Sequence, residues 1–92
     1  MDRFQEMTVF EAVADELSLA AAARRLSLSP PTVTRAIDAL EQRLGVKLLQ
    51  RSTRGVGLTE AGERFLADCR RILAEVSDAD RSASGLHTSP QG

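Results

Sequence analysis

The sequence predicts a mainly helical fold, in which three helices and a small two-stranded hairpin are followed by a long fourth helix. Three observations support this prediction. Apolar residues recur at helical spacing in three segments of residues 1–44, a polar, glycine-containing segment follows a short apolar run at 46–49, and a heptad pattern begins after residue 59. With 92 residues, the chain is long enough for one small domain with an appended helix.

The first predicted helix spans residues 2–17 and is amphipathic. Its apolar stripe consists of Phe4, Met7, Phe10, Val13, Ala14 and Leu17. Acidic residues dominate the opposite side. We therefore expect a packing helix that places two phenylalanine rings in the core and a solvated acidic face in water.

The second predicted helix runs from Ala20 to Leu26 and is rich in alanine. Ala22, Ala23 and Leu26 are expected to face inward, whereas Arg24 and Arg25 face outward. Because no capping residue stands directly before Ala20, we expect a weak N-terminal cap. Leu28 is expected to fill the short turn that follows.

The third predicted helix covers residues 29–44 and has the clearest end signals. Ser29 is a good N-cap, Pro30 suits the first helical position, and Gly45 is a natural C-terminal stop. Its inward stripe consists of Val33, Ala36, Ile37, Leu40 and Leu44. Its outward side shows Pro31, Thr34, Arg35 and Asp38, followed by Glu41, Gln42 and Arg43. A short alanine-rich helix, a turn and this helix together predict a helix-turn-helix, whose second helix enters the DNA major groove.

A small hairpin is predicted next. Val46 to Leu49 is expected to form a strand, residues 51–57 a basic, glycine-containing loop, and Leu58 the start of a returning strand. After a helix-turn-helix, such a hairpin is a wing that lies along the DNA backbone or minor groove. An ordinary surface hairpin with two arginines is the alternative.

A long helix is predicted from Thr59, its N-cap, to residue 84. Its apolar residues follow a 4-3-4-3-4 spacing: Phe65, Cys69, Ile72, Val76, Ala79 and Ala83. This heptad seam predicts dimerisation, and packing on its own domain is the alternative. Cys69 is interpreted as a small buried apolar residue of the seam. Residues 85–92 are polar and predicted to form a flexible hinge.

The net charge of −1 conceals an uneven distribution. Residues 24–54 hold seven basic and two acidic side chains, whereas residues 1–23 hold one basic and five acidic, and residues 55–92 four basic and six acidic. The basic block coincides with the predicted helix-turn-helix and wing, which favours a phosphate-binding face. A solvated charged surface is the alternative.

The composition argues against several other functions. The chain has no Trp or Tyr and three Phe, which disfavours single-strand recognition by aromatic stacking. One cysteine excludes an internal disulfide and a cysteine-based zinc site, and the single histidine, His87, falls in the predicted hinge. We therefore expect no catalytic residues, no cofactor and no metal site. With no signal peptide or apolar span in the sequence, a cytoplasmic location without membrane contact is expected.

The ordered run of these segments resembles the N-terminal DNA-binding region of LysR-type transcriptional regulators. The resemblance rests on the opening helix with Phe10, then AAAARRL, LSPPTVTRAIDALEQRLGVKLLQR and RSTRGVGLTEAG. It implies a winged helix-turn-helix at residues 1–58, a linker and dimerisation helix at 59–84, and a hinge at 85–92 towards an effector-binding domain outside this sequence. The family often has glutamine where this chain has Pro30.

The resemblance implies sequence-specific binding of double-stranded DNA at an interrupted palindromic operator. It implies a homodimer through the linker helix, a higher oligomer in the full-length protein, and a small-molecule effector bound only by the absent domain. The DNA contacts are expected from Ser29, Pro30, Pro31, Thr32, Thr34, Arg35, Arg51, Thr53 and Arg54. The dimer contacts are expected from Phe65, Cys69, Ile72, Val76 and Ala79. A protein-interaction winged-helix module with a coiled-coil dimerisation helix is the alternative.

Overall fold

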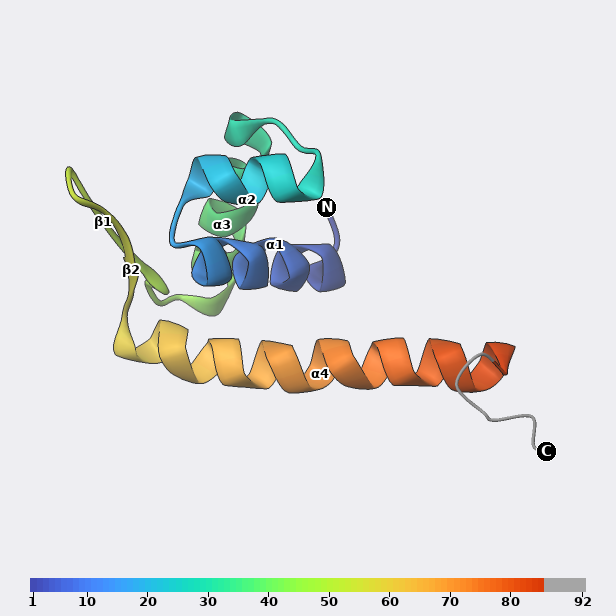
Figure 1. Ribbon diagram of the computed structural model, residues 1–92. Helices are drawn as coiled ribbons and strands as arrows, with labels where there is room; N and C mark the ends of the chain where they lie inside the picture. Colours follow the sequence, from blue (N-terminus) through green and yellow to red (C-terminus); the bar gives the residue numbers. More distant parts are fainter. Residues whose placement is uncertain (86–92) are drawn as a thin grey trace.

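A computed structural model describes residues 1–85 of the chain. Its elements are, in order, α1 (Arg3–Glu16), α2 (Leu19–Leu26), α3 (Pro30–Leu44), β1 (Leu49–Ser52), β2 (Gly55–Leu58) and α4 (Glu60–Ser84) (Figure 1). The two strands pair antiparallel, with Leu49 opposite Leu58 and Ser52 opposite Gly55. The predicted fold class, a winged helix-turn-helix with a long C-terminal helix, is confirmed. Of the predicted hinge, residues 86–92 lie outside the described residues.

Every helix begins at a side-chain cap. Asp2 and Gln5 form a reciprocal capping box at α1, Ser29 caps α3, and the Thr59 hydroxyl accepts from the Gly62 N–H. The weak cap predicted for the second helix is wrong. Its helix begins one residue earlier than predicted, at Leu19, and the Ser18 hydroxyl accepts from the Ala21 N–H at 3.0 Å.

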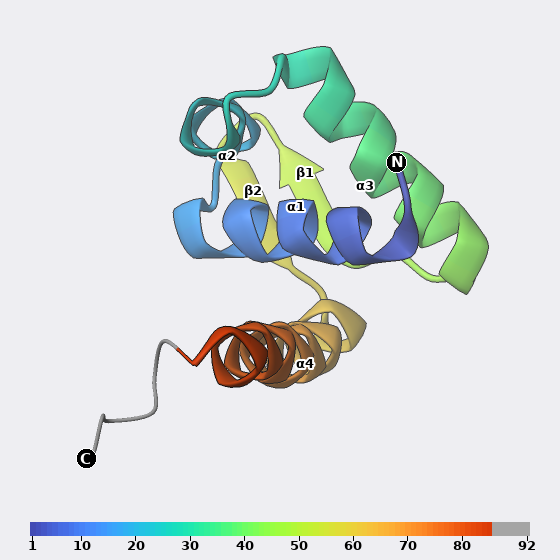
Figure 2. The same cartoon turned by 90° about the vertical axis from the view of Figure 1, so that its right-hand side faces the viewer.

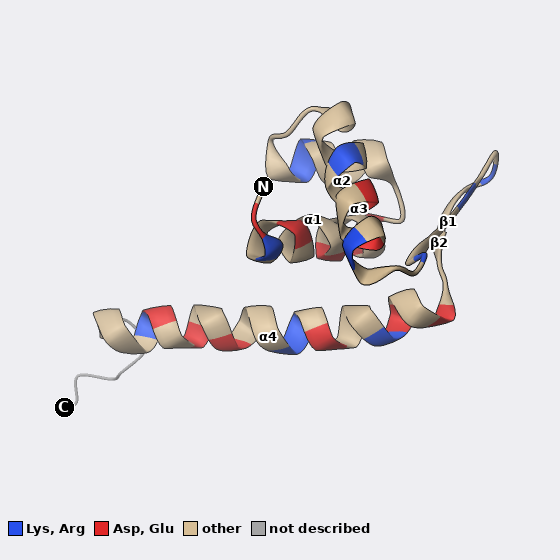
Figure 3. Cartoon of the chain, turned by 180° about the vertical axis from the view of Figure 1, so that it is seen from behind, with Lys and Arg blue, Asp and Glu red and all other residues tan. Residues whose placement is uncertain are grey.

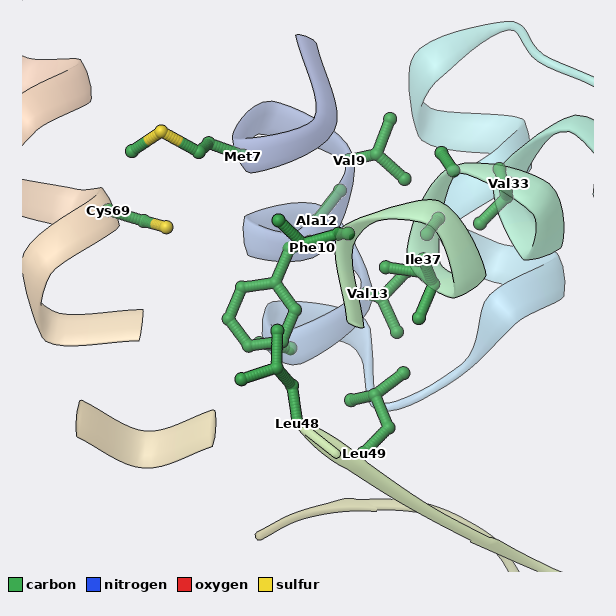
Figure 4. Packing of buried hydrophobic residues seen from close by; sticks show 14 of the residues in the cluster. Met7, Val9, Phe10, Ala12, Val13, Val33, Ile37, Leu48, Leu49 and Cys69 are labelled. Atoms are coloured by element: carbon green, nitrogen blue, oxygen red, sulfur yellow. The ribbon is translucent and has the colours of Figure 1, made fainter. Parts of the chain in front are cut away.

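The core lies around α1, which contacts α2, α3 and α4 (Figures 1 and 2). Its largest fully buried side chains are Phe10, Ile37, Leu40, Leu48, Val13, Val33 and Cys69. Figure 4 labels all of these except Leu40. The Phe65 ring of α4 lies 5.5 Å from the Phe10 ring, centroid to centroid, in a tilted arrangement. The long helix therefore closes one side of the core, and α2 and α3 close the other.

Three apolar residues that were predicted to face the core are exposed. Phe4 is 45% exposed, Leu17 52% and Leu44 40%. Each lies at the end of a helix, where no neighbouring element fully covers the apolar stripe. Leu17 adopts a left-handed conformation, with φ of 51°, and ends α1, so it leaves the helical stripe altogether. The second ring of the core comes from Phe65 in place of Phe4.

The first strand starts three residues later than predicted. Val46 is 43% exposed, and β1 begins only at Leu49. The N–H groups of Leu48 and Leu49 donate to the Glu41 carboxylate. The apolar run at 46–49 thus mainly connects α3 to the hairpin. Strand pairing starts at Leu49, which lies opposite Leu58 of β2.

The start of α4 is fixed against the segment that precedes the hairpin. The Thr59 N–H donates to the Leu48 carbonyl at 3.0 Å, and the Thr59 hydroxyl donates to the Lys47 carbonyl at 2.7 Å. Gly62 makes this approach possible, because a Cβ at that position would lie 2.1 Å from the Leu48 carbonyl oxygen. Within residues 1–85, no helix has the length and apolar character of a membrane span.

Candidate nucleic-acid interface

The α2 and α3 helices form the predicted helix-turn-helix. The turn begins at Ser27, which has a left-handed φ of 58°, and the Leu28 N–H donates to the Ala23 carbonyl at 2.9 Å. Ala22 and Ala23 are fully buried, and their small side chains let the two helices cross closely. This packing leaves the leading turn of α3 exposed at one end of the molecule (Figure 2).

The leading turn of α3 offers side chains but no backbone donors. Pro30 and Pro31 occupy its first positions and have no N–H. The next donor, the Thr32 N–H, is taken by the Ser29 hydroxyl at 3.3 Å. The Ser29 and Thr32 hydroxyls also lie 2.7 Å apart. Residues 30–32 therefore offer no free amide to a phosphate, and contacts from this turn of α3 must come from side chains.

Arg35 follows one turn later and is exposed. Its Nη2 donates to the Thr32 Oγ1 at 3.4 Å, and no carboxylate within residues 1–85 pairs with it. Thr34, the residue before it, is half-buried. The geometry leaves the guanidinium of Arg35 available for an external acceptor.

Some of the seven basic residues in the block at 24–54 already form ion pairs within the chain. Four of them contact carboxylates: Arg25 with Asp15 and Glu16, Arg43 with Glu6, Lys47 with Glu41, and Arg51 with Asp38. Within the part of the chain that the structure describes, Arg24, Arg35 and Arg54 have no such partner. These three are exposed and lie on α2, α3 and the hairpin. Figure 3 shows basic residues on each of these elements. Arg24 was absent from the predicted contacts, because sequence alone does not show which arginines are already paired.

The hairpin projects away from the helices, as expected of a wing (Figure 1). Thr53 and Arg54 form its tip, and Gly55, with φ of 127°, adopts a conformation that disfavours other residues. The Arg54 N–H donates to the Ser52 hydroxyl at 3.2 Å, which orders the turn. Both tip side chains are exposed.

Two acidic residues that were expected on the surface are buried. Glu41 is 6% exposed, and its Oε2 accepts from the N–H groups of Leu48 and Leu49 at 2.8 and 3.1 Å. Glu6 is 7% exposed and pairs with Arg43, which joins α1 to α3. Glu41 stands four residues after Ile37 and thus on the inward stripe, a signal that the sequence did contain.

Asp15 connects three helices. Its carboxylate pairs with Arg25 of α2 at 3.1 Å and with Arg70 of α4 at 2.8 Å. The Arg70 hydrogen bond, helped by Arg25 and opposed by partial burial, lowers the pKa of Asp15 below its usual 3.8. In turn, Asp15 and Glu16 raise the pKa of Arg25.

The predicted heptad seam of α4 divides into two parts. Cys69 has no exposed surface and belongs to the core of its own chain, and Phe65 is half-buried against the same core. The prediction that Cys69 contributes to a dimer interface is therefore wrong, because a side chain without exposed surface has none left for a partner. Ile72 is 37% exposed, Val76 is half-buried and Ala79 is exposed. Burial, together with repulsion from Glu11 and Asp68, raises the pKa of the Cys69 thiol to about 11.

Among residues 1–85, no group of three or more His, Cys, Asp or Glu side chains is placed to hold a metal ion. The exposed polar groups on α3 and the hairpin include the Ser29 and Thr53 hydroxyls, the Arg35 and Arg54 guanidiniums and the Asp38 carboxylate. Hydroxyls and guanidiniums bind anions by hydrogen bonding and, for arginine, by charge.

Comparison with known proteins supports this description. A family model for bacterial regulatory helix-turn-helix proteins of the lysR family matches residues 4–63. The chain is 47% identical over 88 residues to an HTH-type transcriptional regulator of Escherichia coli K12, YnfL, and 42% identical over 92 residues to the transcriptional activator AaeR of the same strain. These matches cover 96% and 100% of this chain but 30% of each relative, so the chain spans less than a third of their length.

Solved structures show the same fold. The DNA-binding domain of CbnR, crystallised in a complex with DNA, superimposes with a TM-score of 0.82 at 49% identity. The match covers 92% of this chain and 98% of that domain.

Proposed function

The chain belongs to the lysR family of bacterial regulatory helix-turn-helix proteins, and on that premise we propose that it binds double-stranded DNA in a sequence-specific manner. In this proposal α3 lies in the major groove, and the wing at residues 51–57 contacts the backbone or the minor groove. The winged helix-turn-helix at 1–58 supplies the contacts, and the helix at 59–84 supplies dimerisation. A protein that binds chromosomal DNA of a bacterium acts in the cytoplasm.

The main support for DNA binding is the placement of arginines that have no carboxylate partner within residues 1–85. Arg35 is exposed on the leading half of α3, and Arg54 is exposed at the wing tip. Arginine donates two hydrogen bonds to guanine O6 and N7 and pairs equally well with phosphate. An arginine that is free of internal ion pairs needs no such pair broken before it contacts DNA.

The remaining contacts follow from the surface of α3. The Ser29 and Thr32 hydroxyls lie at the leading turn of α3, together with Pro30 and Pro31. Thr34 follows with a methyl group and a hydroxyl. We assign the hydroxyls to phosphate oxygens, Arg35 to a base, and Thr53 and Arg54 to the flanking backbone. Arg24 of α2 joins the phosphate contacts.

Dimerisation is assigned to the exposed part of the α4 seam. Ile72, Val76 and Ala79 follow heptad spacing beyond the region that packs on the core. Two copies joined there present two α3 helices to two half-sites of an interrupted palindrome. Formation of higher oligomers and binding of a small-molecule effector are assigned to a longer protein, of the length of the relatives.

The test measures binding across salt concentrations. The protein selects duplexes from a random-sequence pool, and fluorescence anisotropy then measures its affinity for a selected duplex and for a scrambled duplex of equal length. A linear fall of log affinity with log salt, together with preference for the selected duplex, supports the proposal. Affinity without salt dependence or sequence preference contradicts it and favours the protein-interaction module.

Two variants separate base contacts from phosphate contacts. Arg35→Ala is expected to cost about 1–3 kcal/mol on the selected duplex and to relax preference at one position per half-site. Arg54→Ala is expected to weaken binding to both duplexes and to reduce the salt slope by about one. Arg71→Ala, on the exposed side of α4, is the matched control and leaves both quantities unchanged.

A further inference from the structure

Asp38 is the exposed acidic residue of α3 and lies on the face proposed to meet DNA. Pro31, Arg35 and Asp38 stand at helical spacing on that face. Arg35 and Asp38 are three residues apart, a spacing at which a carboxylate and a guanidinium are neighbours and pair on a helix surface. Asp38 nevertheless pairs with Arg51 of β1, Oδ1 to Nη2 at 3.1 Å, and Arg35 hydrogen-bonds Thr32.

We propose that Arg51 is the internal counter-ion of Asp38 and so positions Arg35 for base recognition, in place of binding a phosphate itself. The proposal rests on the proposed DNA-binding function and deepens it. It makes Arg51 a positioning residue that acts through Asp38. The predicted role of Arg51 was a direct DNA contact.

The backbone near Arg51 is placed for this role. Glu41, one turn after Asp38, accepts from the N–H groups of Leu48 and Leu49 and so fixes the start of β1 against α3. Arg51 follows two residues after Leu49 on the same strand, opposite Val56. Its side chain turns back to α3 and is 35% exposed, whereas the unpaired Arg54 stands at the tip. Two acids of α3 thus hold β1, one through its backbone and one through a side chain.

Removing either charge has a different consequence from removing both. Without Arg51, the Asp38 carboxylate stays charged beside Arg35, where it captures the guanidinium and repels phosphates. Without Asp38, the Arg51 guanidinium is free and adds positive charge that attracts any DNA sequence. Without both, the local charge equals that of the native pair, and Arg35 has no unpaired carboxylate beside it, as in the native protein.

A double-mutant cycle tests the proposal, with the selected and scrambled duplexes as probes. Arg51→Ala is expected to weaken binding to the selected duplex roughly threefold to tenfold and to reduce its preference over the scrambled duplex. Asp38→Asn is expected to tighten binding to both duplexes. The double variant Asp38→Asn/Arg51→Ala is expected to return to within about twofold of wild-type affinity, with the wild-type salt slope.

A phosphate-binding Arg51 gives a different pattern. Arg51→Ala then lowers the salt slope by about 0.9 in both the wild-type and the Asp38→Asn backgrounds, and the double variant stays weak. That result overturns the proposal. Arg51→Lys keeps the charge that pairs with Asp38 and is expected to bind within about twofold of wild type. Thermal melting of each variant checks the fold directly.

The matched control is a second exposed pair, Asp68 and Arg71 of α4, which lie 3.0 Å apart. Asp68→Asn and Arg71→Ala, alone or together, are expected to leave DNA affinity unchanged. DNA binding by the chain and the positioning role of Arg51 are tested by different outcomes. Wild-type protein that binds no DNA overturns both. If Arg35→Ala removes base preference, but Arg51→Ala lowers the salt slope by about 0.9 and the double variant stays weak, only the proposed role of Arg51 is overturned.

Discussion

The buried carboxylate of Glu41 is expected to hold the wing in place. Its Oε2 accepts two backbone N–H groups, from Leu48 and Leu49, whose side chains are themselves buried. Glu41→Ala leaves both donors without this acceptor. A buried unsatisfied donor costs about 1–3 kcal/mol, which gives about 2–6 kcal/mol for two. We expect about 3 kcal/mol, because the exposed neighbours Lys47 and Gln50 let water reach part of the vacated space.

Glu41→Gln separates the acceptor from the charge. Both N–H groups donate to one oxygen, so the single carbonyl oxygen of glutamine can replace it. Only the charge assistance of two hydrogen bonds and the contact with Lys47 at 3.6 Å are lost. We therefore expect a cost of about 1–2 kcal/mol, well below that of Glu41→Ala.

Urea unfolding followed by circular dichroism measures both costs. The exposed neighbour Gln42, changed to Ala, is the control and is expected to stay within about 0.5 kcal/mol of wild type. A Glu41→Ala variant that also stays within that range would show that Glu41 does not stabilise the fold as the acceptor of these N–H groups. A Glu41→Gln variant as unstable as Glu41→Ala would show that charge, and not the acceptor geometry, carries the effect.

Three further predictions address other contacts. Gly62→Ala is expected to lower the free energy of unfolding by about 1–3 kcal/mol, because its Cβ would lie 2.1 Å from the Leu48 carbonyl oxygen. Gly57→Ala, with open space around it, is the comparison in the same urea experiment. Equal effects of the two substitutions would contradict the close approach. The lowered pKa of Asp15 means that its pairs stabilise the fold above about pH 4 and that this stabilisation is lost as the pH falls through the folded-state pKa. The melting temperatures of wild type and Asp15→Asn should therefore converge at low pH, and a constant difference would exclude this origin. Ile72→Asp is expected to yield monomers in sedimentation experiments, since it places a charge on the exposed seam; dimers of this variant would remove Ile72 from the interface.

The order and type of the elements were predictable because their signals are local. Ser29, Pro30 and Gly45 mark the ends of α3 by chemistry that acts within a few residues, and the structure confirms all three positions. Thr59 marks the start of α4 in the same way. The cap of α2 was missed because Ser18 stands one residue further back than the predicted start required.

The misplaced residues depend on contacts that are distant in the sequence. Glu41 is buried because two N–H groups seven and eight residues later need an acceptor, and Glu6 is buried beside Arg43, 37 residues away. Cys69 follows heptad spacing but is buried by α1, which no spacing within α4 reveals. For the candidate interface, sequence identifies the basic block, but only the three-dimensional pairing shows that Arg51 is engaged and that Arg24 is not.

The long helix also has a consequence for rotational phase. Its first turns are part of the core, through Leu66 and Cys69, and the same unbroken helix continues to Ser84 (Figure 1). Residues 74–84 therefore extend about 16 Å as a rigid rod from the packed head. Each inserted or deleted residue after Leu73 turns everything beyond it by about 100° and shifts it by about 1.5 Å relative to the α3 surface. The core thus sets the rotational orientation of any surface that packs on the distal part of α4. An insertion of seven residues nearly restores that orientation, whereas an insertion of two does not.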